Sequence, residues 1–211
     1  MGLLGVVALL QAATVGPVSA PASLAGAYDG SQTEIAAELV LHPDGRFDYG
    51  LSYGALDEIA SGRWSASAEA VMLESDPVRP PAYTFTSMGA EKPGRVTATL
   101  QLPEGMEPQY FSFVLTGNGA APIEQQVGPD GEAAISYDPA HPPREIRVIL
   151  PIYDLASQPF PIDLSGEGRR VSVHFTPNDL GHVMFEDTSL TITGEGLQME
   201  RFDRTILFRR R

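Results

Sequence analysis

Large apolar residues alternate with polar residues along much of the chain, and a period of two is typical of β-strands with one buried face. In Arg46–Tyr53 every odd-numbered position is large and apolar, and Ile35–Leu41 shows the same alternation. The segment between them, HPDG at 42–45, suits a tight turn because proline fits its first central position and glycine accepts a positive φ. The two segments are therefore predicted to form a hairpin.

Two further segments, Asp57–Trp64 and Val71–Glu74, continue the hairpin into a meander. Residues 23–76 are therefore predicted to form one block of strands, either an open meander or a small lipocalin-like barrel. Residues 77–93 contain four prolines, which interrupt the alternation around one short strand, Tyr83–Ser87. We expect this stretch to be a proline-rich linker.

Short alternating segments separated by turns continue through residues 94–211. The turn PDG at 129–131 repeats the pattern of the first hairpin, and Val171, Val173 and Phe175 share one face of another strand. Frequent turns without a convincing helical period are typical of sandwiches and barrels. The predicted fold is all-β, with the first block followed by a β-sandwich-like block over residues 94–211.

The composition excludes several functional classes. The chain has 211 residues, of which 14 are basic and 27 acidic, and its net charge is −13. This balance argues against a nucleic-acid partner, because nucleic-acid binders need basic surface to displace counterions. The absence of cysteine excludes disulfides, thiolate metal sites and a cysteine nucleophile. The sequence also lacks a P-loop and a dinucleotide-binding glycine motif, so we name no catalytic and no cofactor-binding residue.

Residues 1–22 carry no charge and have the outline of a signal peptide. The apolar run Met1–Leu10 is followed by small residues and by an A-x-A cleavage pattern at 20–22, which places the mature start near Ser23. The run is too short for a comfortable membrane span, so we expect no transmembrane segment in the mature chain. The lack of a basic residue before the run leaves a buried first strand or helix as the alternative. The expected location is periplasmic or secreted.

A resemblance to known proteins rests on the first block. Gly26-x-Tyr28 followed by LVLHPDGRFDYGLSYGALDEIASGRW resembles small exported lipocalin-like domains, including the N-terminal domain of copper-resistance lipoproteins. The second block, from RVTATLQLPEG onward, is similar to transthyretin-like or carboxypeptidase-regulatory sandwiches, and the whole chain resembles uncharacterised exported β-rich proteins of alphaproteobacteria. The resemblance implies a barrel and a sandwich. It does not imply thiol-based metal handling, because the CxxC of the copper-resistance domains is absent here.

The densest group of candidate metal ligands lies in the segment VHFTPNDLGHVMFED. We take His174, His182 and Asp187 as candidate ligands of a divalent ion, because imidazole and carboxylate are common zinc ligands. The loop between the histidines has to fold His182 back toward His174 for this site to form. The alternative is a turn capped by Asn178 or Asp179, with the histidines on the surface.

A second candidate site is a ligand cavity inside the N-terminal barrel. Small barrels enclose one ligand when their interior is not filled by side chains. The aromatic residues of the first block could line such a cavity: Phe47, Tyr49, Tyr53 and Trp64. The alternative is that the same side chains form a packed core.

These observations favour an exported, non-catalytic β-protein with a binding or structural role in the cell envelope. Its expected partner is an envelope protein, a small apolar ligand or the envelope surface, to which the arginine-rich end at 201–211 could contribute. The alternative is an enzyme, a metal-dependent or carboxylate hydrolase that uses the His174/His182 region.

Overall fold

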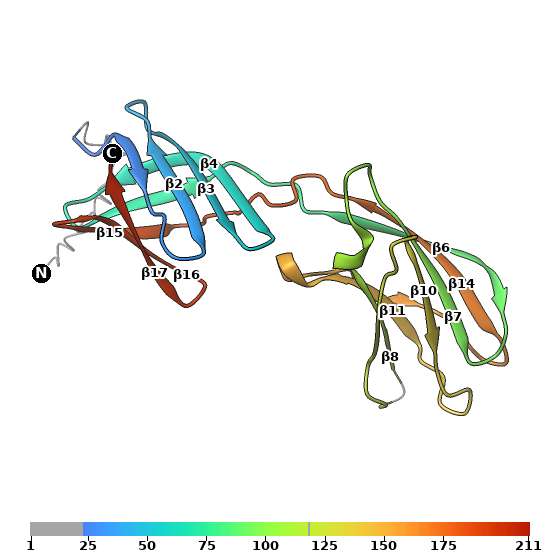
Figure 1. Ribbon diagram of the computed structural model, residues 1–211. Helices are drawn as coiled ribbons and strands as arrows, with labels where there is room; N and C mark the ends of the chain where they lie inside the picture. Colours follow the sequence, from blue (N-terminus) through green and yellow to red (C-terminus); the bar gives the residue numbers. More distant parts are fainter. Residues whose placement is uncertain (1–22, 118) are drawn as a thin grey trace, which may run out of the picture. The chain divides into compact units, whose positions relative to one another are not determined.

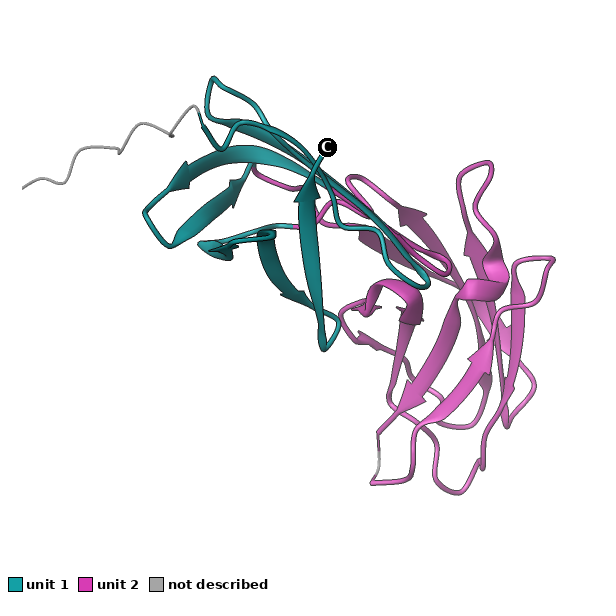
Figure 2. Cartoon of the chain, turned by 60° about the vertical axis from the view of Figure 1, so that its left-hand side comes forward, with its two compact units in different colours: residues 1–51, 60–76, 184–211 teal, residues 52–59, 77–183 magenta. Residues whose placement is uncertain are grey.

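The computed structural model of the protein describes residues 23–117 and 119–211 (Figure 1). The predicted signal peptide at 1–22 lies outside the described residues. The described chain is all-β, as predicted, and it divides into two compact units (Figure 2). Unit 1 contains residues 23–51, 60–76 and 184–211 of the described chain, and unit 2 contains residues 52–59 and 77–183.

Unit 1 is built on a closed barrel of eight strands, so the barrel alternative for the first block is confirmed. The barrel closes because β1 pairs with both β2 and β17. In order around the barrel, the strands are β1 (Gly26–Asp29), β17 (Arg204–Arg210), β16 (Gly196–Arg201), β15 (Thr188–Thr193), β5 (Ala70–Ser75), β4 (Leu56–Ala66), β3 (Arg46–Tyr53) and β2 (Ile35–Leu41).

The predicted hairpin turn at 42–45 is present in this barrel. The N–H of His42 donates to the carbonyl of Arg46 at 2.8 Å, and the N–H of Gly45 donates to the carbonyl of His42 at 3.1 Å. Gly45 has a φ of +84°, which a residue with a side chain rarely adopts. The glycine at the end of the HPDG segment therefore serves the role expected of it.

The structure corrects the two predicted boundaries of the C-terminal part. Residues 94–211 do not form one block, because β15, β16 and β17 pair within the barrel beside strands from the N-terminal block (Figure 1). Residues 77–93 are not a linker, because they contain β6 (Ala82–Glu91), a full strand of unit 2. Alternation identifies a strand but not its neighbours, so strands from distant segments look alike in the sequence.

Unit 2 contains two sheets that share one core. The first sheet has the order β10 (Glu132–Ser136), β7 (Arg95–Gln101), β14 (Gly168–Thr176), β6. The second has the order β12 (Leu155–Ala156), β11 (Glu145–Leu150), β8 (Ser112–Thr116), β9 (Ile123–Gln126), and β13 (Phe160–Pro161) also pairs with β11. Two short 3₁₀ helices, Pro108–Tyr110 and Pro151–Tyr153, complete the unit.

The core of unit 2 lies between these sheets, which gives the sandwich predicted for the second block. Phe175 of β14 meets Phe111 edge-on, with the ring centroids 5.2 Å apart. Apolar residues from both sheets are fully or almost fully buried around this pair, including Val96, Ala98, Ile135 and Val173 from one sheet and Phe113, Leu115, Ile146 and Val148 from the other. Burial of such side chains is the main stabilising contribution to a sandwich.

Within the described ranges, no helix has the length and apolar character needed to cross a membrane.

Candidate binding groove

The candidate metal ligands do not come together. Among residues 23–117 and 119–211, no three His, Asp or Glu side chains form a group that could hold a metal ion. His174 is exposed on β14, opposite Thr84 of β6, and Asp187 belongs to unit 1, whereas both histidines belong to unit 2. The metal site expected at His174, His182 and Asp187 is therefore not assembled in the described residues.

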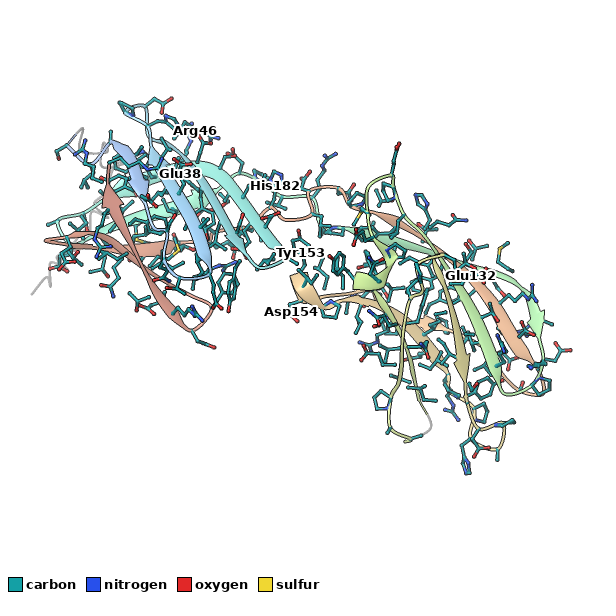
Figure 3. All side chains as sticks on the ribbon, viewed as in Figure 1. Glu38, Arg46, Glu132, Tyr153, Asp154 and His182 are labelled. Carbon is teal, nitrogen blue, oxygen red and sulfur yellow. The ribbon has the colours of Figure 1, made fainter. Side chains whose placement is uncertain are left out.

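The loop between the histidines is instead a capped turn. The guanidinium of Arg79 donates to Asp179 at 3.1 Å, and its backbone N–H donates to the same carboxylate at 2.8 Å. These hydrogen bonds lower the pKa of Asp179 below its usual value. The amide of Asn178 donates to the carbonyl of Pro80 at 2.8 Å. His182 follows this turn with an exposed side chain (Figure 3), so the turn holds the start of β6 rather than an ion.

The aromatic residues predicted to line a barrel cavity are mostly core residues. The ring of Phe185 lies 5.0 Å from that of Tyr49 and 6.2 Å from that of Phe47, and all three side chains are buried. Trp64 is 4% exposed, and its indole N–H donates to the carbonyl of His42 at 2.9 Å. Tyr53 lies at the end of β3, is only partly buried, and falls in unit 2. The four residues thus do not surround one hollow, and the packed-core alternative describes Phe47, Tyr49 and Trp64.

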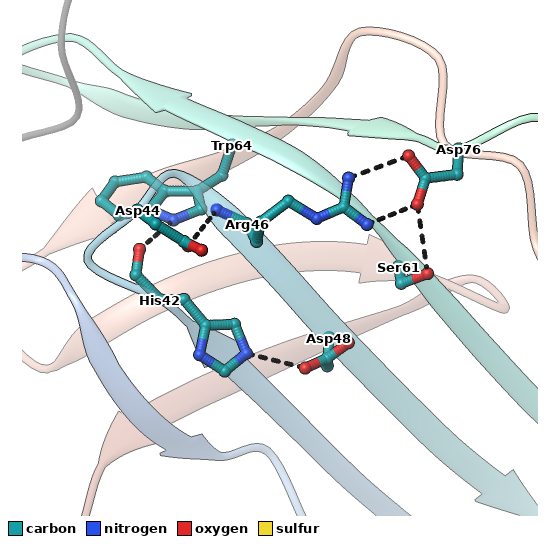
Figure 4. Close-up of polar contacts among 7 residues, drawn as sticks. All are labelled: His42, Asp44, Arg46, Asp48, Ser61, Trp64 and Asp76. Carbon is teal, nitrogen blue, oxygen red and sulfur yellow. Dashed lines mark hydrogen bonds and ion pairs between the residues drawn. The ribbon is translucent and has the colours of Figure 1, made fainter.

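A polar cluster on the barrel contains serine, histidine and aspartate side chains, the residue types of many catalytic sites (Figure 4). Arg46 donates to both oxygens of Asp76, and one of these oxygens also accepts the hydroxyl of Ser61 at 3.5 Å. The imidazole Nε2 of His42 lies 2.7 Å from a carboxylate oxygen of Asp48. Serine and histidine therefore engage different carboxylates, and the cluster links β3, β4 and the end of β5 rather than forming a nucleophile–base pair.

One segment at the end of β3 fits a catalytic motif by its sequence. Residues 50–54 read GLSYG and fit the G-x-S-x-G pattern of a nucleophile elbow, which requires a strand–turn–helix context. Here the segment ends β3 and leads directly into β4. The Ser52 hydroxyl donates to Asp57 across this hairpin at 2.6 Å. The structural context of an elbow is therefore missing in this segment.

The arginine-rich C-terminal end is paired with acidic groups of the same unit. Arg211 Nη1 lies 2.6 Å from Glu38, while Arg209 and Arg204 lie 3.5 Å from Glu195 and from Glu34. These ion pairs are exposed and each contributes little to stability. They nevertheless offset part of the positive charge at this end, while the guanidinium of Arg210 is held by the backbone carbonyls of Ser23 and Ala25.

A groove of about 670 Å³ lies at one open side of the sandwich in unit 2. Its walls come from the start of β6 and from the segment containing β12 and β13, which are residues 80–85 and 155–160. Every residue in these two stretches is uncharged, although the chain as a whole carries a net charge of −13. The volume is within the range usual for ligand sites.

Aromatic side chains form the apolar part of this groove. Phe85 and Phe160 are stacked, with the ring centroids 4.9 Å apart and 7° between the planes. Tyr83 packs on Phe175 at 5.0 Å, and burial raises the pKa of its hydroxyl to about 12. Its hydroxyl oxygen is buried and has no hydrogen-bond partner among the described residues. The groove therefore offers aromatic and aliphatic surface with few polar groups.

A second hollow in unit 2, of about 640 Å³, has a different chemistry. Tyr110 and Tyr153 contribute aromatic surface to it, and Glu104 and Glu107 contribute carboxylates. The pKa of the Tyr153 hydroxyl is raised, and burial is the largest of the several causes. A neutral apolar ligand would meet two negative charges here, so the groove at β6 suits such a ligand better.

The sequence does not reveal this groove, because the four prolines of residues 77–93 predict a linker there. The available signal was the stretch AYTFTSMGA at 82–90, which alternates at its start and contains neither charge nor proline. Its wall partners at 155–160 begin 65 residues after the end of this stretch and show no pattern that connects them to β6. Comparison with protein families, curated proteins and solved structures finds no match to this chain.

Proposed function

We propose that the chain is an exported, non-catalytic binding protein of the cell envelope. In this proposal the sandwich unit carries the binding surface and the barrel unit is a packed scaffold. The observation that carries the proposal is the uncharged groove between β6 and the β12–β13 segment. The signal-peptide outline of residues 1–22 supports export, and the resemblance to exported lipocalin-like domains agrees with it.

The chemistry of the groove selects a neutral ligand with apolar surface. A charged group placed against Phe85, Leu155 and Phe160 would lose hydration without gaining a counter-charge from the groove wall. Apolar surface placed there would gain roughly 25 cal/mol for each Å² removed from water. The groove therefore favours neutral over charged molecules, in contrast to the acidic remainder of the surface.

The binding part of the proposal is tested with the neutral dye Nile red and the whole protein. We expect dye fluorescence to rise on mixing, and the variant Ala156→Trp to weaken dye binding about tenfold, since Ala156 is an exposed residue of the groove wall. The matched control is Ala134→Trp, an exposed alanine on β10 at the other edge of the sandwich. Equal dye binding by the two variants, or no binding by the natural chain, would contradict the proposal.

The export part is tested by producing the full sequence in a bacterial host and measuring the mass of the protein recovered from the envelope. We expect a mature chain that starts near Ser23, because the A-x-A pattern ends at Ala22. Recovery of only the uncleaved chain, in the cytoplasm, would contradict export without affecting the groove experiment.

A further inference from the structure

The wall of the groove formed by β6 is an open sheet edge. β6 is the last strand of its sheet, and within residues 23–117 and 119–211 its one strand partner is β14, in an antiparallel register from Ala82 opposite Thr176 onward. Its residues 82–90 contain no proline and no charge, although edge strands are usually protected by such residues. A register shift opposite Arg170/Val171 marks a bulge, so the regular part of the edge is Ala82–Ser87, the part beside the groove.

The opposite wall of the groove is an edge that cannot accept a strand. β12 and β13 are separated by a break at Ser157, whose hydroxyl takes the place of a backbone acceptor for the N–H of Val148 at 3.0 Å. Pro159 and Pro161 follow, and proline has no N–H to donate. The two edges that flank the groove are therefore different: one is protected, and the other is free to pair.

We infer that the groove binds an extended segment of another polypeptide, which adds to β6 as a further strand of the sheet. This inference rests on the proposed function and names its ligand. A strand beside Ala82–Ser87 would satisfy backbone groups at the sheet edge and would direct every second side chain into the groove. Backbone pairing gives affinity, and the groove selects the alternate side chains.

The groove wall also determines the composition of the segment. Side chains that pack against Phe85, Phe160 and Leu155 meet only uncharged residues, so they are apolar and of moderate size. A charged side chain at these positions would be desolvated without a partner. The bound segment therefore alternates apolar residues, facing the groove, with residues of any neutral or polar type, facing outward.

A second copy of the chain fits the groove less well than a separate segment. In an antiparallel pair of β6 strands, the inward side chains of the second copy would be Tyr83 and Phe85, which already pack on Phe175 and Phe160 of their own sandwich. They are not available to fill a neighbour's groove. A free segment of a partner has no such commitment.

The inference is tested by selecting random peptides of about ten residues, displayed on phage, on the whole protein. We expect the recovered peptides to alternate apolar with other residues, to lack charge at the apolar positions and to displace Nile red. Two versions of the best peptide are then made, N-methylated at its odd or at its even positions. Since only one set of N–H groups faces β6, one version should bind about tenfold more weakly and the other within about twofold.

A pair of glutamine variants tests the location. Gln158→Glu adds one charge to the groove wall, and Gln125→Glu adds the same charge to an exposed position on β9, at the far edge of the same sheet. We expect Gln158→Glu to weaken peptide binding about fivefold or more and Gln125→Glu to leave it unchanged. Equal effects of the two variants would overturn the location.

Three other outcomes overturn the inference while leaving the proposed function intact. Equal binding of both N-methylated versions would show recognition by side chains alone, without an added strand. Nile red binding that no peptide displaces would indicate a small apolar ligand. Dimerisation that depends on protein concentration and that Thr84→Lys abolishes would assign the β6 edge to a second copy. Failure of both dye and peptides would contradict the proposed function itself.

Discussion

Phe85 and Phe160 connect the two sheets of the sandwich at its open side, since their rings stack 4.9 Å apart with an interplanar angle of 7°. Phe85 belongs to β6 and Phe160 to β13, so the stack sets the spacing of the two edges that flank the groove. Stacked aromatic pairs contribute about 0.5–1.5 kcal/mol beyond the area that they bury. The stack is therefore both a wall of the groove and a support for it.

We expect Phe160→Ala to lower the free energy of unfolding by about 2 kcal/mol, below the range for a fully buried phenylalanine because the ring is partly exposed. Urea denaturation measures this loss, and Phe160→Leu, which keeps apolar volume, should recover about half of it. A double-mutant cycle with Phe85→Ala should give a coupling of about 1 kcal/mol. Additive losses would mean that the two rings do not support each other.

The buried hydroxyl of Tyr83 predicts an unusual gain. A buried donor without a partner costs about 1–3 kcal/mol, and Tyr83→Phe removes that donor while keeping the ring on Phe175. We expect the free energy of unfolding to rise by about 1 kcal/mol. Tyr28→Phe is the matched control, because the Tyr28 hydroxyl donates to the carbonyl of Leu24 at 2.7 Å and its loss should destabilise the protein by a similar amount. A loss of stability in both variants would contradict this account.

The same tyrosine predicts a pH effect with a definite sign. Its pKa is raised by burial from 10.0 to about 12, so between these values the unfolded chain ionises Tyr83 and the folded chain does not. Ionisation of Tyr83 therefore leaves stability unaffected below pH 10 and lowers it as the pH rises toward 12. Urea denaturation of the natural chain and of Tyr83→Phe across this range should show a shallower decline for the variant.

Arg46 and Asp76 produce the opposite pH dependence in the barrel. The hydrogen bonds from Arg46 lower the pKa of Asp76 below 3.8, so the folded state favours the carboxylate. Its stabilising contribution is present above that value and is lost as the pH falls through the lowered pKa of the folded state. We expect Asp76→Asn to reduce stability at pH 7 and to flatten the decline as the pH falls below 3.8, as measured by urea denaturation. Asp203→Asn, at an exposed turn, should leave that decline unchanged.

The sequence predicted local structure well and pairing between distant segments poorly. The hairpin at 42–45 was predictable because its proline and glycine have conformational requirements that act over four residues. The return of Thr188–Arg210 to the barrel was not, because alternation describes which face of a strand is buried and not which strand lies beside it. The same limit separates β6 from the β12–β13 segment in the sequence.

The candidate sites show a similar division. Aromatic alternation identified Phe47, Tyr49 and Trp64 as inward-facing, which they are, but whether a barrel interior is full depends on Phe185 and Phe208 from a distant segment. The histidine-rich segment suggested a metal site from proximity along the chain. In the fold, the carboxylate of Asp179 accepts hydrogen bonds from Arg79 instead of binding an ion. These two partners are 100 residues apart in the sequence.

Closure of the barrel depends on a close approach at Gly62 that a single methyl group would prevent. Gly62 lies opposite Ser75, and a Cβ atom there would collide with the carbonyl oxygen of Glu74 and with the ring of Phe47. Because the first contact is a backbone atom and the second a buried core ring, neither can move aside, and we expect Gly62→Ala to lower the free energy of unfolding by about 3 kcal/mol or more, as measured by urea denaturation. Gly50→Ala on the neighbouring β3 meets no atom within 4 Å, and removal of glycine flexibility should raise stability by about 0.5 kcal/mol. Equal effects of the two substitutions would mean that β4 and β5 accommodate a side chain at position 62, so that closure of the barrel does not depend on this glycine.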